Sequence, residues 1–234
     1  MRQIVLDTET TGLDHRTGDR IIEIGCVELN GRTISERRFH TYLNPGRPSD
    51  PGAVAVHGLT DEFLADKPRF ADVVGEWSAF VRGAELIIHN AAFDVGFLDN
   101  ELQLLGQEPV EQLCGNVVDT LKMARDLRPG RKNNLNALCA EFGVDNSNRQ
   151  WHGALLDAEL LADVYLAMTR GQNSLAMDFD VPSGGHTQLA ADRPALRVLR
   201  ANPDELAAHA GVLAEISKES KGKCLWQKLD AAIV

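Results

Sequence analysis

Two acidic residues stand where a strand is expected to run into the protein core. The apolar stretch Ile4-Val5-Leu6 leads directly into Asp7 and Glu9 of the motif DTETTG. Residues two apart in a strand point to the same face, so these two carboxylates share a face near the end of the predicted strand. Burial of an unpaired carboxylate is costly. Such carboxylates normally protonate or find partners, although either acid alone could cap the turn that follows.

Two aspartates stand on the apolar faces of predicted helices. Asp94 falls on the apolar stripe of a helix expected at 93–105, and Asp157 on that of a helix expected at 155–168. Either aspartate alone has a structural explanation, because an acid in the first turn of a helix is stabilised by about 0.3–1 kcal/mol. Together with Asp7 and Glu9 they make four inward carboxylates that would repel one another. Divalent cations with oxygen ligands remove that conflict.

The types of these residues favour one kind of chemistry. Carboxylates without clustered Cys or His favour Mg²⁺ or Mn²⁺ over zinc, and two such ions about 3.5–4 Å apart can assist a phosphoryl displacement. His152 stands five residues before Asp157, in RQWHGALLD. Its ordinary pKa near 6.5 would let it accept a proton at neutral pH. A lone histidine is more often a plain surface or core residue, so this role depends on the carboxylates.

Three motifs carry a resemblance to a known family. DTETTG at 7–12, HNAAFDVGFLDNE at 89–101 and HGALLDAELLADVY at 152–165 resemble those of the DEDDh 3′→5′ exonucleases, which have a ribonuclease H-like fold. The resemblance covers most of residues 1–170. It implies that two Mg²⁺ or Mn²⁺ ions are bound and that His152 is the catalytic general base. The implied metal ligands are Asp7, Glu9, Asp94 and Asp157, and substrate contacts are implied for Asp7, Glu9 and Asp157.

Two further stretches narrow the resemblance. VHGLTDEFL at 56–64 and CLWQKL at 224–229 resemble the epsilon (proofreading) subunits of bacterial DNA polymerase III. In that family the histidine that matches His57 lies near the bound terminal nucleotide, which implies a substrate-binding role for His57. The family's acid five residues earlier is replaced here by Gly52. A turn role for a histidine that precedes a glycine is the alternative.

The end of the chain suggests binding partners. Gln172, Leu175 and Met177 match the glutamine and apolar anchors of short peptides that bind the bacterial sliding clamp. Leu225 and Trp226 resemble the part of the family that docks on the polymerase (alpha) subunit, although Trp226 packed on its own domain is the alternative. The implied substrate is a single-stranded or frayed 3′ DNA end. The family resemblance also leaves room for a small accessory subunit.

The elements that must position these residues follow a recognisable order. Three consecutive strands are expected at 3–9, 21–29 and 33–43, with Asn30-Gly31 as a type I′ hairpin signal. Helices then alternate with short apolar strands. This order predicts an α/β domain with a mixed sheet flanked by helices, as in the ribonuclease H-like fold. The later helices are expected at 70–81, 93–105, 120–127, 135–142 and 155–168, and the later strands at 85–89 and 117–118.

The composition changes after residue 170. The segment 171–194 is rich in Gly, Ser, Asp, Gln and Pro, which predicts a flexible linker. Asn202-Pro203-Asp204-Glu205 predicts the start of a helix. We therefore expect an exonuclease domain at 1–170, a linker with the clamp-binding-like peptide at 171–194, and a short helical tail for polymerase docking at 195–234.

The bulk composition limits the class of protein. Of 234 residues, 44% are hydrophobic and 25% are charged, and the net charge is −10. This charge argues against a broad cationic nucleic-acid surface, but leaves room for one small metal-binding cleft. Apolar runs fall short of the roughly 20 residues that span a bilayer, and MRQIVLD lacks a secretory signal, so we expect a cytoplasmic protein. Four scattered cysteines without a C-x-x-C pair predict free thiols: Cys26, Cys114, Cys139 and Cys224.

These features favour one function over two others. We expect a 3′→5′ exonuclease that removes mispaired 3′ nucleotides from DNA, as the proofreading subunit of a replicative polymerase. An exoribonuclease of the same superfamily would use the same chemistry but has no need of a clamp-binding peptide. A catalytically silent adaptor would have no need of the inward carboxylates.

Overall fold

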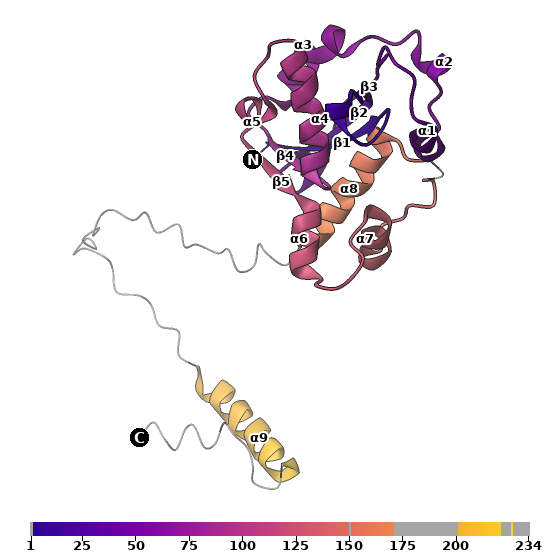
Figure 1. Ribbon diagram of the computed structural model, residues 1–234. Coiled ribbons are helices and arrows are strands. Elements are labelled where there is room, and N and C mark those ends of the chain that lie inside the picture. The colour runs from indigo at the N-terminus through magenta and orange to yellow at the C-terminus, as the bar shows by residue number, and fades with distance from the viewer. Residues whose placement is uncertain (1, 150, 171–200, 221–225, 227–234) are drawn as a thin grey trace, which may run out of the picture. The chain divides into compact units, whose positions relative to one another are not determined.

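The computed structural model describes residues 2–149, 151–170, 201–220 and 226 (Figure 1). Contacts divide the chain into two units, residues 1–179 and 180–234. Helix α9 (Pro203–Glu219) belongs to the second unit. The first unit contains β1 (Arg2–Thr10), η1 (His15–Thr17), β2 (Ile21–Asn30), β3 (Thr33–Tyr42), α1 (Pro51–His57), α2 (Asp61–Leu64), α3 (Phe70–Val81), β4 (Glu85–Ile88), α4 (Ala91–Leu104), α5 (Val110–Leu113), β5 (Asn116–Asp119), α6 (Thr120–Leu127), α7 (Leu135–Phe142) and α8 (Ala154–Met168).

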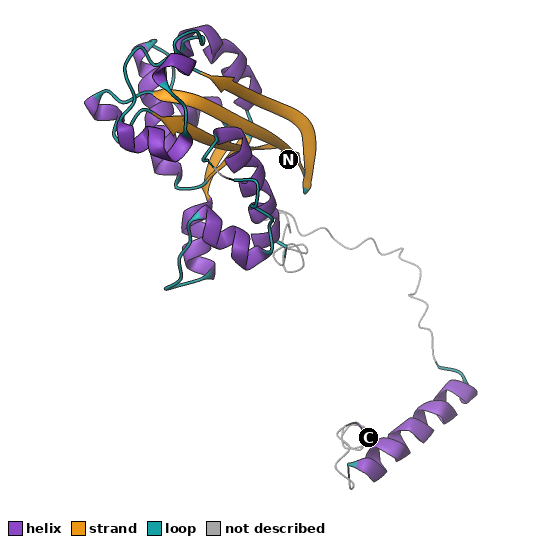
Figure 2. Cartoon of the chain, turned by 90° about the vertical axis from the view of Figure 1, so that its right-hand side faces the viewer, coloured by secondary structure: helices purple, strands orange, loops and turns teal. Residues whose placement is uncertain are grey.

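The strands form one mixed sheet in the order β3-β2-β1-β4-β5. Strands β1, β2 and β3 are antiparallel neighbours, whereas β4 runs parallel to both β1 and β5. The carboxyl ends of β1, β4 and β5 therefore meet at the same edge of the sheet. Figure 2 shows the sheet with helices packed around it. The predicted mixed α/β fold is confirmed.

Alternation along β1 decides where its acids point. Ile4 and Leu6 belong to the core formed with α3 and α4, whereas Val5 packs on the opposite face against α8. Asp7 and Glu9 lie two and four positions after Val5, so they face α8. Thr8 faces α4 instead. Strand β1 thus directs the carboxylates of Asp7 and Glu9 toward α8 and the hydroxyl of Thr8 toward α4.

Close packing between β2 and α8 brings a third acid to the same place. Gly25 pairs with Asp7 across the β1–β2 ladder. A Cβ atom at Gly25 would lie 2.3 Å from the carbonyl carbon of Ala154 and from the amide nitrogen of Leu155. The first turn of α8 therefore rests on the backbone of the sheet, which is possible because residue 25 has no side chain. This contact places Asp157, in that first turn, beside β1.

Some local features differ from the sequence-based expectations. Strand β2 is buried at every position from Ile21 to Leu29, because helices cover both faces of the central sheet. The turn between β2 and β3 is centred on Gly31-Arg32, and only Gly31 has a positive φ, of 61°. One positive φ at the first central residue is the type II′ pattern, so the type I′ prediction was wrong. The short helices α1, α2 and α5 were not predicted.

The second unit is represented by helix α9. It begins after Asn202, as the sequence predicted, and Asn202 and Glu205 exchange hydrogen bonds in a capping box. Its described side chains include no buried residue, and apolar Leu206, Val212 and Ile216 are exposed. The linker 171–194 lies outside the described residues, so its boundaries stay predictions. None of the helices in the described ranges is long and apolar enough to cross a membrane.

Candidate active site

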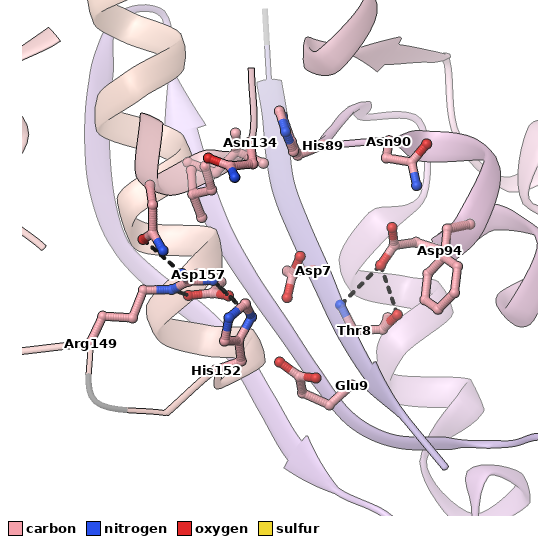
Figure 3. Close-up of a pocket in the computed structure, with 14 residues that line it drawn as sticks. Asp7, Thr8, Glu9, His89, Asn90, Asp94, Asn134, Arg149, His152 and Asp157 are labelled. Atoms are coloured by element: carbon pink, nitrogen blue, oxygen red, sulfur yellow. Dashed lines mark hydrogen bonds and ion pairs between the residues drawn. The ribbon is translucent and has the colours of Figure 1, made fainter. Parts of the chain in front are cut away.

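A cavity of about 360 Å³ lies where β1, α4 and α8 meet (Figure 3). It brings together the five residues that the sequence singled out for catalysis, from segments far apart in the chain. The polar side chains that line it are Asp7, Thr8, Glu9, His89, Asn90, Asp94, Asn134, Asn136, Arg149, His152 and Asp157.

Asp94 connects α4 to β1. The backbone nitrogen and the hydroxyl of Thr8 both donate to Oδ1 of Asp94, at 3.1 and 2.7 Å. The helix begins after Asn90, which has a φ of 67° and whose backbone nitrogen donates to Oδ1 of Asp119 at 3.2 Å. Buried Asp94 is thereby held in the first turn of α4, beside Asp7.

Three of the four acids resist ionisation in this setting. Burial raises the pKa of Asp7 well above its ordinary value, and the nearby carboxylate of Asp94 raises it further. Burial, followed by Asp157 and Glu23, raises the pKa of Glu9 to about 8. Burial raises the pKa of Asp94 to about 7, although its hydrogen bonds from Thr8 oppose the shift. Crowded carboxylates repel one another when they are ionised. A bound cation would therefore stabilise their ionised forms.

Arg149 supplies a positive charge to the site. Its Nε and one terminal nitrogen donate to the two carboxylate oxygens of Asp157, each at 2.5 Å. The same terminal nitrogen lies 2.9 Å from Nδ1 of His152. Arginine can only donate, so Nδ1 accepts this bond and a neutral His152 carries its proton on Nε2. Burial and the charge of Arg149 lower the pKa of His152.

The donor set fits a hard divalent cation. Glu9, His152 and Asp157 each offer one ligand atom, and these atoms lie within 4.8 Å of one another. Figure 3 shows Asp7 between this group and the Thr8–Asp94 pair. Carboxylate oxygens predominate, as Mg²⁺ and similar ions require. Because His152 stands within the group, its geometry suits a ligand as well as the predicted general base.

His57 lies outside this cavity and borders the next one. That hollow of about 590 Å³ shares Thr8, Glu9 and Phe93 with the catalytic cavity and is also lined by Gly52. Nδ1 of His57 accepts a hydrogen bond from the backbone of Leu59 at 3.0 Å, and its buried Nε2 has no partner among the described residues. A Cβ at Gly52 would meet nothing within 4 Å. The replaced acid thus leaves open space at Gly52, in the hollow that His57 also lines.

Sequence reasoning missed several residues of the site. His89 and Asn90 follow β4, and their place at the carboxyl end of a strand parallel to β1 was a usable signal. Nδ1 of His89 lies 2.9 Å from the hydroxyl of Thr120, and burial lowers the pKa of His89. Arg149 and Asn134 come from loops, and nothing in the sequence distinguished them from surface residues.

The predicted partner-binding residues mostly fall outside the described part of the chain. Gln172, Leu175, Met177 and Leu225 are not among the described residues. Trp226 is described, and it is 66% exposed.

The catalytic unit has clear relatives among nucleases. The family model for exonucleases (RNase_T) matches residues 4–165. Exonuclease X in complex with 5′ overhanging duplex DNA is 27% identical, with a TM-score of 0.58 over 73% of this chain and 93% of that chain. Escherichia coli exonuclease I bound to a dA16 oligonucleotide shares the fold, with a TM-score of 0.64 and 20% identity over 74% of this chain and 42% of that chain. The chain belongs to the exonuclease family, in which dependence on divalent metals is general.

Full-length relatives make the assignment more specific. DNA polymerase III subunit epsilon of Pasteurella multocida is 50% identical, over 97% of this chain and 94% of that protein. The same subunit of Escherichia coli K12 is 48% identical, over 97% of both chains. Within the exonucleases, the chain belongs to the epsilon subunits of DNA polymerase III. It is a 3′→5′ proofreading exonuclease.

Proposed function

We propose that this enzyme hydrolyses the terminal phosphodiester of a mispaired 3′ DNA end with two divalent cations, Mg²⁺ or Mn²⁺. Asp7, Glu9, Asp94 and Asp157 would hold these ions. Bound there, the ions would polarise the scissile phosphate and stabilise charge on the attacking and leaving oxygens. The observation that carries the proposal is the convergence of four acids in one cavity, two of them buried and two half-buried, and three of them with raised pKa values.

His152 is the general base in this proposal. It borders the cavity and its side chain is 46% exposed, so both a water molecule and bulk solvent can reach it. The lone pair on Nδ1 becomes available when Arg149 withdraws its hydrogen bond. The imidazole then takes a proton from the attacking water and releases it to solvent, and a 5′-mononucleotide leaves.

The cavity beside His57 suits the terminal nucleotide. Buried Nε2 of His57, which has no hydrogen-bond partner in the described part of the chain, is a group that a nucleotide could satisfy. Asp7, Glu9 and Asp157 would lie against the phosphate. A mispaired end costs less to unpair and unstack than a paired one, which would give the enzyme its preference for errors.

The partner proposals follow from the family. The relatives are named as subunits of DNA polymerase III, so we assign the tail at 195–234, with Leu225 and Trp226, to the polymerase (alpha) subunit. Exposed apolar residues on α9 and exposed Trp226 support this assignment. Gln172, Leu175 and Met177 would bind the sliding clamp, and a small accessory subunit fits the family. In this role the protein works in the bacterial cytoplasm, at the replisome.

Mononucleotide release from a labelled primer tests the catalytic proposal. The unaltered protein should degrade a 3′-mismatched DNA primer with Mg²⁺ or Mn²⁺ but not with EDTA. Asp7→Ala should fold and lose this activity, whereas Asp66→Ala, at an exposed acid, should keep it. Equal rates for Asp7→Ala and the unaltered protein would refute the metal assignment. Faster degradation of an RNA oligonucleotide than of DNA would favour the exoribonuclease alternative.

A truncation tests the polymerase assignment separately. The protein lacking 195–234 should retain nuclease activity, because the catalytic residues all belong to the first unit. It should no longer co-purify with the polymerase subunit. Retained co-purification would show that docking uses another surface.

A further inference from the structure

A third hollow, of about 730 Å³, continues the catalytic cavity on the side away from His57. It shares His89, Asn90 and Asn134 with the catalytic cavity, whereas the hollow beside His57 shares Glu9. In Figure 3, Glu9 and the His89–Asn90–Asn134 group lie on opposite sides of Asp7. The three hollows therefore form one path that passes the catalytic acids in its middle.

The lining of this third hollow is cationic. Arg125 comes from α6, and Arg131 and Lys132 come from the loop that joins α6 to α7. Arg131 is paired with Glu141 at 3.2 Å. Arg125 and Lys132 are exposed, and neither has a side-chain hydrogen bond or ion pair among the described residues. Two such unpaired cations beside the active site stand out in a chain with a net charge of −10.

The loop that carries Lys132 is firmly attached. Arg128 donates to Glu141 at 3.0 Å and to the side chain of Asn133 at 3.3 Å. Asn133 is buried and donates to the backbone oxygen of Arg131 at 3.1 Å. Arg128 and Asn133 thus fasten the loop, while Arg125 and Lys132 remain available to a ligand.

We propose that this hollow binds the phosphodiester backbone of the substrate strand on the 5′ side of the scissile bond. The inference rests on the proposed function, in which the terminal nucleotide lies on the His57 side. The rest of the strand then leaves past Asn90 and Asn134 toward Arg125 and Lys132. Exposed cations with neighbouring amide groups are typical of surfaces that follow a single strand without reading its sequence.

A comparison of two substrates tests this placement in the full-length protein. The single-stranded oligonucleotide dT12 would fill the hollow, whereas thymidine 5′-(p-nitrophenyl phosphate) ends at the scissile bond. For the double variant Arg125→Gln/Lys132→Gln, the KM for dT12 should rise about tenfold, with kcat unchanged. The KM for the nitrophenyl ester should stay within about twofold. The salt dependence of kcat/KM for dT12 should become shallower by about 1.4 log units per log unit of salt.

The control variant Arg82→Gln/Arg170→Gln removes the same charge from exposed sites outside this path. Arg82 precedes β4 at the end away from His89, and Arg170 follows α8 at the end away from Asp157. An unchanged KM for dT12 in Arg125→Gln/Lys132→Gln, or the same rise in the control, would overturn the inference and favour an acidic polypeptide as occupant. Equal loss on both substrates would also overturn it, because the two residues would then act on the catalytic centre. If the unaltered protein cleaves neither substrate, the proposed function itself fails.

Discussion

Arg149 forms a buried two-pronged ion pair with Asp157, and their side chains are only 6% and 5% exposed. Among the described residues that line the catalytic cavity, Arg149 is the one permanent cation facing four carboxylates. It also occupies Nδ1 of His152. The arrangement therefore offsets the charge of Asp157, and it occupies the one nitrogen of a neutral His152 that could accept a proton.

Loss of Arg149 should destabilise the metal-free protein more than the metal-bound one. Removing one partner of a buried pair costs roughly 3–5 kcal/mol, so Arg149→Gln should lower the free energy of unfolding by about 3 kcal/mol in EDTA. Urea unfolding with EDTA and with Mn²⁺ measures this, and Mn²⁺ should stabilise the variant more than the unaltered protein. The exposed pair of Arg16 and Asp14 provides a control, since Arg16→Gln should change little. If Mn²⁺ raised the free energy of unfolding of Arg149→Gln no more than that of the unaltered protein or of Arg16→Gln, the prediction would be wrong.

Stability of the metal-free protein should fall as pH rises from about 6.5 to 8. The pKa values of Glu9 and Asp94 are raised to about 8 and about 7, from ordinary values of 4.5 and 3.8. In that window the folded state binds more protons than the unfolded state, so each group lowers the free energy of unfolding by up to about 1.4 kcal/mol per pH unit. Groups with lowered pKa values act mainly below this window: they are Glu28 and the histidines His57, His89 and His152.

Urea unfolding in EDTA at pH 6.5, 7, 7.5 and 8 measures this slope. The fluorescence of fully buried Trp77 reports on the first unit. Saturating Mn²⁺ should flatten the slope, because a bound cation favours the ionised carboxylates. A metal-free stability that stays level or rises across the range would show that the acids are not crowded in solution.

Replacement of His152 should affect the reaction and not the fold. General base catalysis contributes about 10²–10⁴ in rate, so His152→Gln should lower kcat by that factor. Its exposed side chain makes a large change in melting temperature unexpected. His209→Gln, on exposed α9, is the matched control and should retain full activity on single-stranded DNA. A loss in kcat below threefold would assign the base to another group.

Gly25 should be essential for stability and activity, because β2 packs closely against the first turn of α8 at this residue. The Cβ of Gly25→Ala would overlap the backbone of Ala154 and Leu155, so α8 must move away from the sheet. We expect a loss of about 1–3 kcal/mol in stability and, because Asp157 moves with the helix, a loss of about 10² in kcat. Gly75→Ala, in α3 where a Cβ meets nothing within 4 Å, should be stabilising by about 0.4–1 kcal/mol. Urea unfolding and primer degradation measure both effects, and full activity of Gly25→Ala would refute this account.

The acids of the site could be predicted because each violates a local rule. Asp7 and Glu9 end an apolar strand, and Asp94 and Asp157 interrupt apolar helical stripes, so periodicity alone points them inward. Arg149 and Asn134 break no such rule. Their places depend on how the loops before α7 and α8 pack in three dimensions, which local patterns do not encode. The sequence did not predict the type II′ turn at Gly31, because Asn30-Gly31 favours a type I′ turn in a different register of the same hairpin.

The two ends of the first unit must meet before the site exists. Asp7 lies in the first strand and Asp157 in the last helix of that unit, and Arg149 and His152 come just before that helix. A ribosome that has released only the first three-quarters of this unit therefore exposes a chain that lacks the base and one of the four acids. The nascent polypeptide cannot assemble the catalytic site until synthesis of the whole catalytic unit is nearly finished.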